Sequence, residues 1–282
     1  MMYFCADDYG LCQTASRRIE SGIEKGVLNK VSVFPNFDKI DFDKILKKDV
    51  LISLHLNLVE GKCMTDEKIP LLADENGFFR HTFGGLFKLN LFSKKEFEKQ
   101  VYSEIKAQVL FWKSILPPET PFCIDSHQHT HMIPAVFRAL TKVLKDENID
   151  LLYMRIPVEP LSPYLKSPSL YFTYSAVNVI KQWLINFLWL FNKKHAIVDS
   201  AYFSGILFSG KMDRMRVRKI LPYYEKLSLK NGKDVEILFH PGYLNEDTRF
   251  NHENIKFYNF YLSKNRKTEF DAVMNLSEGC DL

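Results

Sequence analysis

The sequence predicts an α/β protein folded as a (β/α) TIM-like barrel, either distorted or built from seven strands. Short β-rich apolar runs alternate with longer helical patterns along the chain, which is typical of βα units around a parallel sheet. No repeat, low-complexity tract or linker rich in proline, glycine and serine interrupts this series. We therefore expect one barrel domain over residues 1–282, a length that α/β barrels commonly reach. An open sheet with a separate cap is the competing architecture.

The predicted strands are short apolar runs rich in β-branched and aromatic residues. In chain order they cover residues 2–6, 31–35, 51–58, 122–126, 151–156, 197–203 and 235–240. Between them, longer stretches with a helical apolar period predict helices. These helices cover residues 13–25, 41–48, 94–116, 135–146, 177–191 and 213–230, and residues 270–276 are expected to form a last helix.

Two connections are longer than the others, residues 60–94 and residues 158–174. The first contains four glycines and a proline, and the second contains three prolines. Loops of this length in a compact domain usually cover a functional site, and we expect the same here.

The composition limits the classes of function. The 38 basic and 34 acidic side chains are scattered along the chain and leave a formal charge of +4, so no basic face indicates a nucleic-acid partner. Five cysteines form no Cys-x-x-Cys pair and are odd in number, which argues for a reducing compartment. The N-terminus enters an apolar strand without the features of a signal peptide. We therefore expect a cytoplasmic protein.

The most apolar stretch, residues 183–191, is nine residues long and is interrupted by Asn186. A transmembrane helix needs roughly 20 apolar residues, so no transmembrane segment is expected. We interpret the stretch as a helix packed against the protein body or a dimer partner. Peripheral contact with a membrane is the alternative interpretation.

Polar residues that could carry chemistry lie at the carboxyl ends of five predicted strands. In chain order they are Asp7 and Asp8, His55, Asp125 and His127, Arg155, and His240. In parallel barrels and doubly wound sheets the active site is built at that edge, because the loops converge there. The five strands therefore predict one common site.

Asp8, His55 and His127 match the donor set of a catalytic metal site, which takes about three ligands from His, Asp or Glu and leaves a position for water. A lone strand histidine is more often a satisfied core residue. The convergence of three strands makes the metal-binding interpretation the stronger one.

Residues 125–131 contain more histidines than one metal ion requires. If this segment is extended, its period of two places Asp125, His127, His129 and His131 on one face. We expect His127, nearest the strand end, to be the ligand. The other three, together with Asn57, are expected to contact the substrate or to hydrogen-bond the ligands. A structural zinc site is a weaker alternative because no cysteine pair accompanies the cluster.

Adjacent carboxylates at Asp7 and Asp8 allow one to bind metal and the other to accept a proton. The alternative is that one of them only caps the following helix. His240 precedes Pro241 and could act as a general acid, because imidazole titrates near neutral pH. Arg155 supplies a permanent cation for a carboxylate or an oxyanion.

Four motifs occur in order: Ala6-Asp7-Asp8-Tyr9-Gly10, Leu54-His55-Leu56-Asn57-Leu58, residues 125–131, and His240-Pro241-Gly242. This combination resembles the YdjC-like carbohydrate deacetylases, whose best-known members deacetylate chitooligosaccharides. The resemblance spans residues 2–243, and Gly61 with residues 69–78 is similar to the family's substrate-side loop. Tyr9, where the family usually has Phe, and the apolar residues 183–191 depart from the pattern.

The resemblance implies a distorted (β/α) barrel, usually dimeric, with a divalent cation that is commonly magnesium. The implied ligands are Asp8, His55 and His127. It further implies that Asp7 is the general base, that His240 is the general acid and that Arg155 orients Asp7. The donor set itself also accepts zinc.

The predicted function is therefore the metal-dependent removal of an acetyl group from an N-acetylated sugar or oligosaccharide, with acetate and an amino sugar as products. One alternative is another metal-assisted hydrolase such as a phosphoesterase, which would favour a second metal about 4 Å away. The other is a non-catalytic glycan-binding barrel, which should have lost a ligand or an acid/base residue. The identity of the sugar is not predicted by the sequence.

Overall fold

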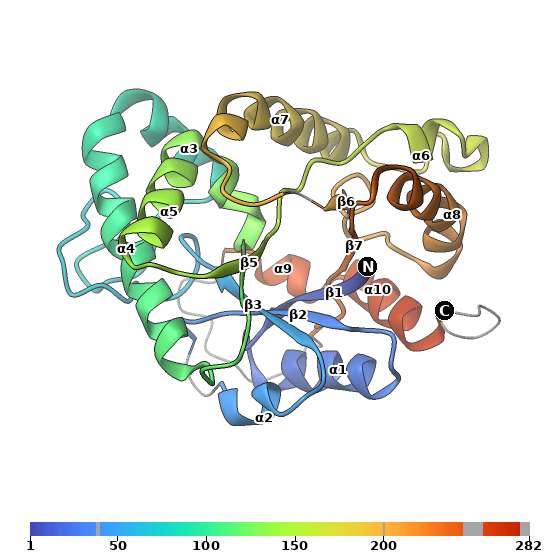
Figure 1. The fold of residues 1–282 in the computed structure, drawn as a ribbon, viewed down its shortest axis with the longest axis horizontal. Coiled ribbons are helices and arrows are strands. Elements are labelled where there is room, and N and C mark those ends of the chain that lie inside the picture. Colours follow the sequence, from blue (N-terminus) through green and yellow to red (C-terminus); the bar gives the residue numbers. More distant parts are fainter. Residues whose placement is uncertain (38–39, 200, 245–255, 277–282) are drawn as a thin grey trace.

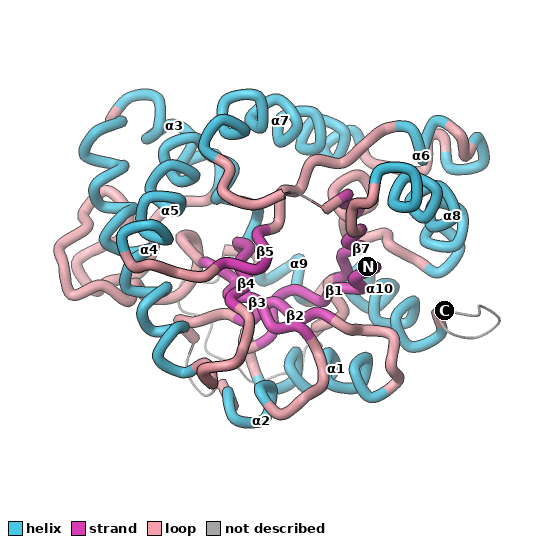
Figure 2. The backbone as a smooth tube through the Cα atoms, in the orientation of Figure 1, coloured by secondary structure: helices cyan, strands magenta, loops and turns pink. Residues whose placement is uncertain are grey.

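A computed structural model describes residues 1–37, 40–199, 201–244 and 256–276. Seven parallel strands form one sheet in the order β5-β4-β3-β2-β1-β7-β6. The sheet curls into an arc whose open side faces helix α7, with the other helices around the outside (Figures 1 and 2). The predicted α/β fold, a distorted TIM-like barrel with seven strands, is confirmed as a half-barrel.

The strands are β1 (Met2–Tyr9), β2 (Lys30–Val33), β3 (Leu51–Leu56), β4 (Phe122–Ser126), β5 (Leu151–Met154), β6 (Tyr202–Ser204) and β7 (Val235–Phe239). Every residue of β2, β4 and β7 is buried. Parallel strands are covered on both faces, which explains why they appear in the sequence as continuous apolar runs. Because all seven run in one direction, their carboxyl ends share one edge.

The longer helices are α1 (Gln13–Glu24), α3 (Phe83–Phe92), α4 (Lys94–Ile115), α5 (Pro134–Asp146), α7 (Ala176–Asn192), α8 (Arg214–Asn231) and α10 (Lys264–Asn275). The shorter ones are α2 (Phe42–Leu46), α6 (Ser162–Leu165), α9 (Tyr258–Tyr261), and the 3₁₀ turns η1 (His127–Met132), η2 (Pro168–Leu170) and η3 (Lys193–His195). In the described part of the chain, no helix is long and apolar enough to cross a membrane.

Several boundaries differ from the prediction. The connection 60–94 contains α3, because Leu86 and Asn90 are buried and this packing outweighs the two glycines in its first turn. The connection 158–174 contains α6 and η2. The sixth strand has only three residues and begins at Tyr202, and the last helix begins at Lys264 instead of residue 270. Ser200, in the predicted sixth strand, and Cys280 lie outside the described residues.

Candidate metal centre and active site

Strand β1 ends with two buried carboxylates, Asp7 and Asp8. Asp8 has a φ of +71°, a left-handed conformation that aspartate tolerates better than most residues. The pairing of β1 with β2 is irregular between Ala6 and Tyr9. This irregularity breaks the alternation of the strand, so both carboxylates approach one nitrogen. Nε2 of His55 lies 3.9 Å from an oxygen of Asp7 and 3.3 Å from an oxygen of Asp8.

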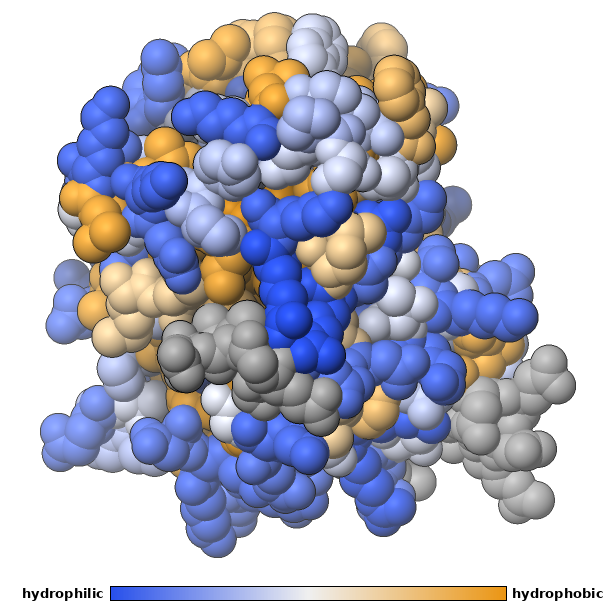
Figure 3. All heavy atoms as spheres, turned by 90° about the vertical axis from the view of Figure 1, so that its right-hand side faces the viewer, coloured by the Kyte–Doolittle hydropathy of each residue, from blue (hydrophilic) through white to orange (hydrophobic). Residues whose placement is uncertain are grey.

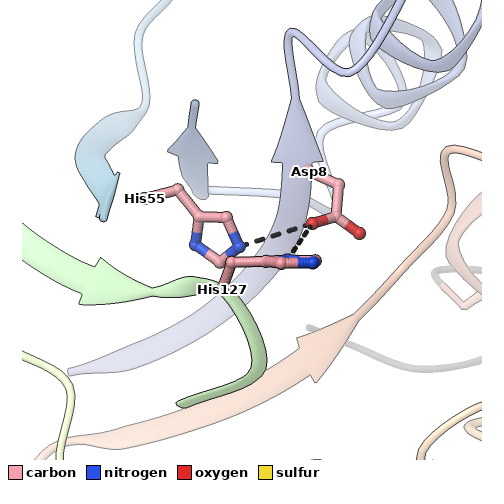
Figure 4. Close-up of side chains that lie close together, drawn as sticks. All are labelled: Asp8, His55 and His127. Atoms are coloured by element: carbon pink, nitrogen blue, oxygen red, sulfur yellow. Dashed lines mark hydrogen bonds and ion pairs between the residues drawn. The ribbon is translucent and has the colours of Figure 1, made fainter. Parts of the chain in front are cut away.

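Asp8, His55 and His127 surround a common point (Figure 4). Oδ1 of Asp8 lies 3.3 Å from Nε2 of His55 and 3.1 Å from Nδ1 of His127, and all three ligand atoms lie within 4.8 Å of one another. Two ligands of one ion at about 2.1 Å are roughly 3.0–3.4 Å apart in octahedral or tetrahedral geometry. Nε2 of His55 has no hydrogen-bond partner among the described residues. The donor set and its spacing therefore fit one divalent cation.

Asp125 fixes the orientation of His55. Its Oδ1 lies 2.6 Å from Nδ1 of the imidazole, while its Oδ2 accepts from Ser32 at 2.7 Å and Lys30 at 3.2 Å. A carboxylate on one imidazole nitrogen directs the other nitrogen toward a metal, and this is the usual arrangement around metal-binding histidines. Burial alone would lower the pKa of His55, but the nearby carboxylates, Asp7 first, raise it to about 10.

Residues that the sequence did not indicate contact the other two candidate ligands, Asp8 and His127. Arg266 of α10 forms an ion pair with Oδ2 of Asp8, and Oε2 of Glu60 lies 3.5 Å from Nε2 of His127. Tyr261 of α9 donates to the same oxygen of Glu60 at 2.5 Å. Burial opposes ionisation of Asp8, but Arg266 holds its pKa well below the usual range. Arg266 and Tyr261 follow the last strand, where no pattern in the sequence linked them to the site.

Asp7 belongs to a buried ion cluster inside the half-barrel, formed by Asp7, Lys30, Asp125, Arg155 and Glu236. Arg155 donates to both oxygens of Asp7 at 2.8 Å and, from Nε, to Glu236 at 2.7 Å. Burial would raise the pKa of Asp7, yet Arg155 lowers it to about 2. Lys30 and Glu236 were missed, although a charge within an otherwise buried strand was a usable signal. The cluster keeps Asp7 ionised and fixes its orientation.

His240 follows β7 and is held by Glu269 of α10. Its backbone N–H donates to Oε2 of Glu269 at 2.5 Å, and Nδ1 of its ring lies 3.2 Å from the same oxygen. The Glu269 side chain is fully buried, while that of His240 is 16% exposed. With Nδ1 facing the carboxylate, Nε2 is the nitrogen that can exchange a proton with a bound molecule.

Residues 125–131 are not extended, so the condition under which Asp125, His127, His129 and His131 would share one face is not met. After Ser126 the chain enters η1, in which Gln128 and His129 have left-handed φ angles of 54° and 55°. His131 is consequently buried, with Nε2 donating to the carbonyl of Arg155 at 2.8 Å and Nδ1 accepting from Ser126 at 2.5 Å. Both ring nitrogens are occupied, so His131 ties η1 to the end of β5.

His129 is partly exposed, and its ring packs edge-on against Phe203. Nδ1 of His129 is buried without a hydrogen-bond partner among the described residues. Burial and the positive charge of Arg155 hold the pKa of His129 well below its usual range. This neutral imidazole therefore lies near the Arg155 guanidinium and has one buried nitrogen without a hydrogen-bond partner among the described residues.

Asn57 orders the loop after β3. Its side-chain oxygen accepts from the N–H groups of Val59 at 3.0 Å and Glu60 at 3.1 Å, and its amide nitrogen donates to Asn36 at 2.9 Å. These bonds occupy the side chain and present Glu60 to His127. In the structure Asn57 thus organises the loop that carries Glu60.

The sequence profile of the family described as YdjC-like protein matches residues 1–277 of the chain. A carbohydrate deacetylase from Danio rerio is 32% identical over 157 residues, which cover 55% of this chain and 49% of that protein. The match thus spans about half the length of that relative. A carbohydrate deacetylase from Xenopus laevis is 27% identical over 253 residues, which cover 84% of this chain and 79% of that protein.

A solved structure from Enterococcus faecalis, named for cellobiose-phosphate cleavage, superimposes with a TM-score of 0.62 at 17% identity. The superposition covers 97% of this chain and 90% of that one. At this identity the likeness establishes the shared fold only.

Proposed function

The chain belongs to the YdjC-like protein family, and from this premise we propose that it is a metal-dependent carbohydrate deacetylase. The reaction is hydrolysis of the acetamide of an N-acetylated sugar or oligosaccharide to acetate and an amino sugar. One observation carries the proposal. The ligand atoms of Asp8, His55 and His127 converge beside Asp7, a carboxylate kept ionised by Arg155.

The three ligands would hold one divalent cation, with magnesium expected and zinc also compatible with the donors. Such an ion lowers the pKa of bound water and polarises a carbonyl oxygen. Asp125 fixes the orientation of His55, and Glu60 contacts His127, so the ligand atoms are held in place before an ion binds.

Asp7 is the general base in this proposal. One of its oxygens lies 3.9 Å from Nε2 of His55, so the carboxylate borders the metal position. Its pKa of about 2, which Arg155 lowers against the effect of burial, leaves it ionised at neutral pH and able to accept the proton of the attacking water. The two bonds from Arg155 fix both oxygens and limit their rotation.

His240 is the general acid. An amide nitrogen leaves poorly unless it is protonated, and the imidazole can deliver that proton from Nε2 while Nδ1 faces Glu269. The Glu269 carboxylate holds the ring. His129, whose ring is partly exposed, is proposed to contact the substrate. A homodimer, as the family resemblance implies, and a cytoplasmic location, as the odd number of cysteines indicates, belong to the same proposal.

A phosphoesterase is the competing hydrolase. The group Asp7, His55 and Asp125 also meets the spacing of a metal site, which would favour two ions. However, the second group shares His55 with the first, Arg155 holds both oxygens of Asp7, and Asp125 faces the opposite ring nitrogen. These contacts favour a site with one metal ion over a site with two, and therefore favour a deacetylase over a phosphoesterase.

The test compares two products. Chelator-stripped protein, reloaded with magnesium, zinc, manganese or cobalt, is incubated with N-acetylglucosamine oligomers and separately with an aryl phosphate. We expect acetate release and no phosphate release. Asp7→Asn should retain the cation and lose about 10²–10⁴-fold in kcat. Phosphate release in place of acetate, or near wild-type turnover by Asp7→Asn, would overturn the assignment.

A further inference from the structure

Helix α7 turns its polar side chains inward. Its buried positions include Asn178, Gln182 and Asn192. Their side-chain amides donate to backbone carbonyls at distances of 2.7–3.3 Å. Asn178 donates to Leu207 and Ser209, Gln182 donates to Glu159, and Asn192 donates to Met132. These bonds attach α7 across the open side of the half-barrel, next to η1 (Figure 1).

The outward face of α7 is apolar. Its exposed side chains are Val177, Ile180, Trp183, Phe187, Leu190 and Phe191, which are 42–66% exposed. They recur every three or four residues and so form one stripe along the helix. The inward face also carries the buried Ile185 and Leu188, so α7 has apolar side chains on both faces, whereas the outward face of a surface helix is normally polar. The outward stripe therefore indicates a non-aqueous partner.

The segment that leads into α7 extends this face. Leu161 and Leu165, in and beside α6, are 50% and 64% exposed, and Phe172 is 93% exposed with a left-handed φ of 62°. Figure 3 shows apolar side chains gathered along the upper edge of the molecule, where Figure 1 places α6 and α7. We call these nine exposed side chains of α6, α7 and Phe172 the α6–α7 apolar surface.

The segment that carries this surface contains only positive charges. Residues 161–198 contain four lysines, at positions 166, 181, 193 and 194, and no aspartate or glutamate. These lysines equal the formal charge of +4 on the whole chain, so acidic and basic residues balance elsewhere. All four lysines are exposed. Docking of a second copy through a two-fold axis would bring these like charges together, whereas an anionic surface complements them.

We propose that the α6–α7 apolar surface docks on a lipid bilayer that carries anionic headgroups. The aromatic and aliphatic side chains would enter the headgroup boundary, and the lysines would contact lipid phosphates, as in helices that lie in the membrane plane. Helix α7, which carries most of this surface, packs with its inward side against η1, which carries His127, so the docking helix adjoins the candidate active site. The proposal is independent of the reaction catalysed.

Flotation with vesicles of phosphatidylcholine alone or mixed with phosphatidylglycerol tests this proposal. We expect the intact protein to float with the mixed vesicles, to bind less at high salt, and to bind phosphatidylcholine vesicles more weakly. Trp183→Ser combined with Phe187→Ser should weaken binding about tenfold or more. Lys193→Glu combined with Lys194→Glu should weaken binding by roughly fivefold or more for each lysine replaced.

Leu229→Ser is the matched control, because Leu229 is 86% exposed on α8 outside this surface. It should bind vesicles like the unmodified protein. Acetate release from soluble oligomers by the Trp183/Phe187 variant reports that the fold is intact and separates failure of docking from failure of the proposed reaction. Absence of vesicle binding, or a dimer that this variant converts to a monomer, would overturn the proposal.

Discussion

Replacing Arg155 with Met tests whether the buried ion cluster depends on its cations. The cluster contains three carboxylates, on Asp7, Asp125 and Glu236, and two cations, on Lys30 and Arg155. Arg155 is fully buried and contacts the three carboxylates at 2.6–3.4 Å. Its loss changes the formal charge of this buried cluster from −1 to −2.

Removing one partner of a buried ion pair costs about 3–5 kcal/mol, a large part of the roughly 5–15 kcal/mol that stabilises a typical protein. We expect this loss in the free energy of unfolding of Arg155→Met, measured by urea denaturation of the metal-free protein. Asp7→Asn restores the cluster charge to −1. The double variant should therefore lose about 1–3 kcal/mol less than the sum of the single losses.

The control is Arg138→Met, which removes a partly exposed ion pair with Glu98. We expect a cost below about 1 kcal/mol, because water already screens that pair. If Arg155→Met costs no more than Arg138→Met, or if its cost adds independently to that of Asp7→Asn, the reasoning about the cluster is refuted.

Three further predictions concern catalysis, pH and metal. In steady-state assays of acetate release, His240→Ala should lower kcat about 10²–10⁴-fold, and Glu269→Gln should lower it by a smaller factor. KM should change little in both variants. Equal rates in the wild type and His240→Ala would exclude His240 as the general acid. Burial raises the pKa of Glu104 from 4.5 to about 7, so the folded state holds a proton that the unfolded state has lost. Between pH 4.5 and 7 the free energy of unfolding of the wild type, measured with urea, should therefore fall by about 2–3 kcal/mol relative to that of Glu104→Gln. If the difference between the two proteins does not change with pH, this prediction is contradicted. A cation at 100 times its dissociation constant should add about 2.7 kcal/mol to the stability of the wild type and almost nothing to Asp8→Asn, as thermal unfolding with and without chelator would report.

The strands and the edge that carries the site could be predicted from the sequence. Buried parallel strands have a continuous apolar composition, and their carboxyl ends converge whatever the loops do. This geometry explains why one site brings together the side chains of Asp7, Asp8, His55, His127 and Arg155, as the sequence predicts. Local pattern and topology were sufficient for these residues.

The remaining features depend on contacts between distant segments. The left-handed turn at Gln128 and His129 contains no glycine that would indicate it in the sequence. Because of this turn, His131 does not share a face with Asp125 and His127, as it would in an extended segment. Arg266 pairs with Asp8 across 258 positions of the chain, and such pairing leaves no periodic signal. Helix α3 was missed because its glycines suggest a loop, while its packing favours a helix.

Hydrolysis is proposed to depend on a cation that Asp8, His55 and His127 hold. The most direct test measures acetate release from N-acetylglucosamine oligomers while chelator-stripped protein is titrated with a divalent cation, with His127→Ala in parallel. The wild type should be silent without cation and recover to a plateau, and the variant should stay inactive at the concentration that saturates the wild type. Acetate release without any cation, or equal recovery by His127→Ala, would contradict the claim.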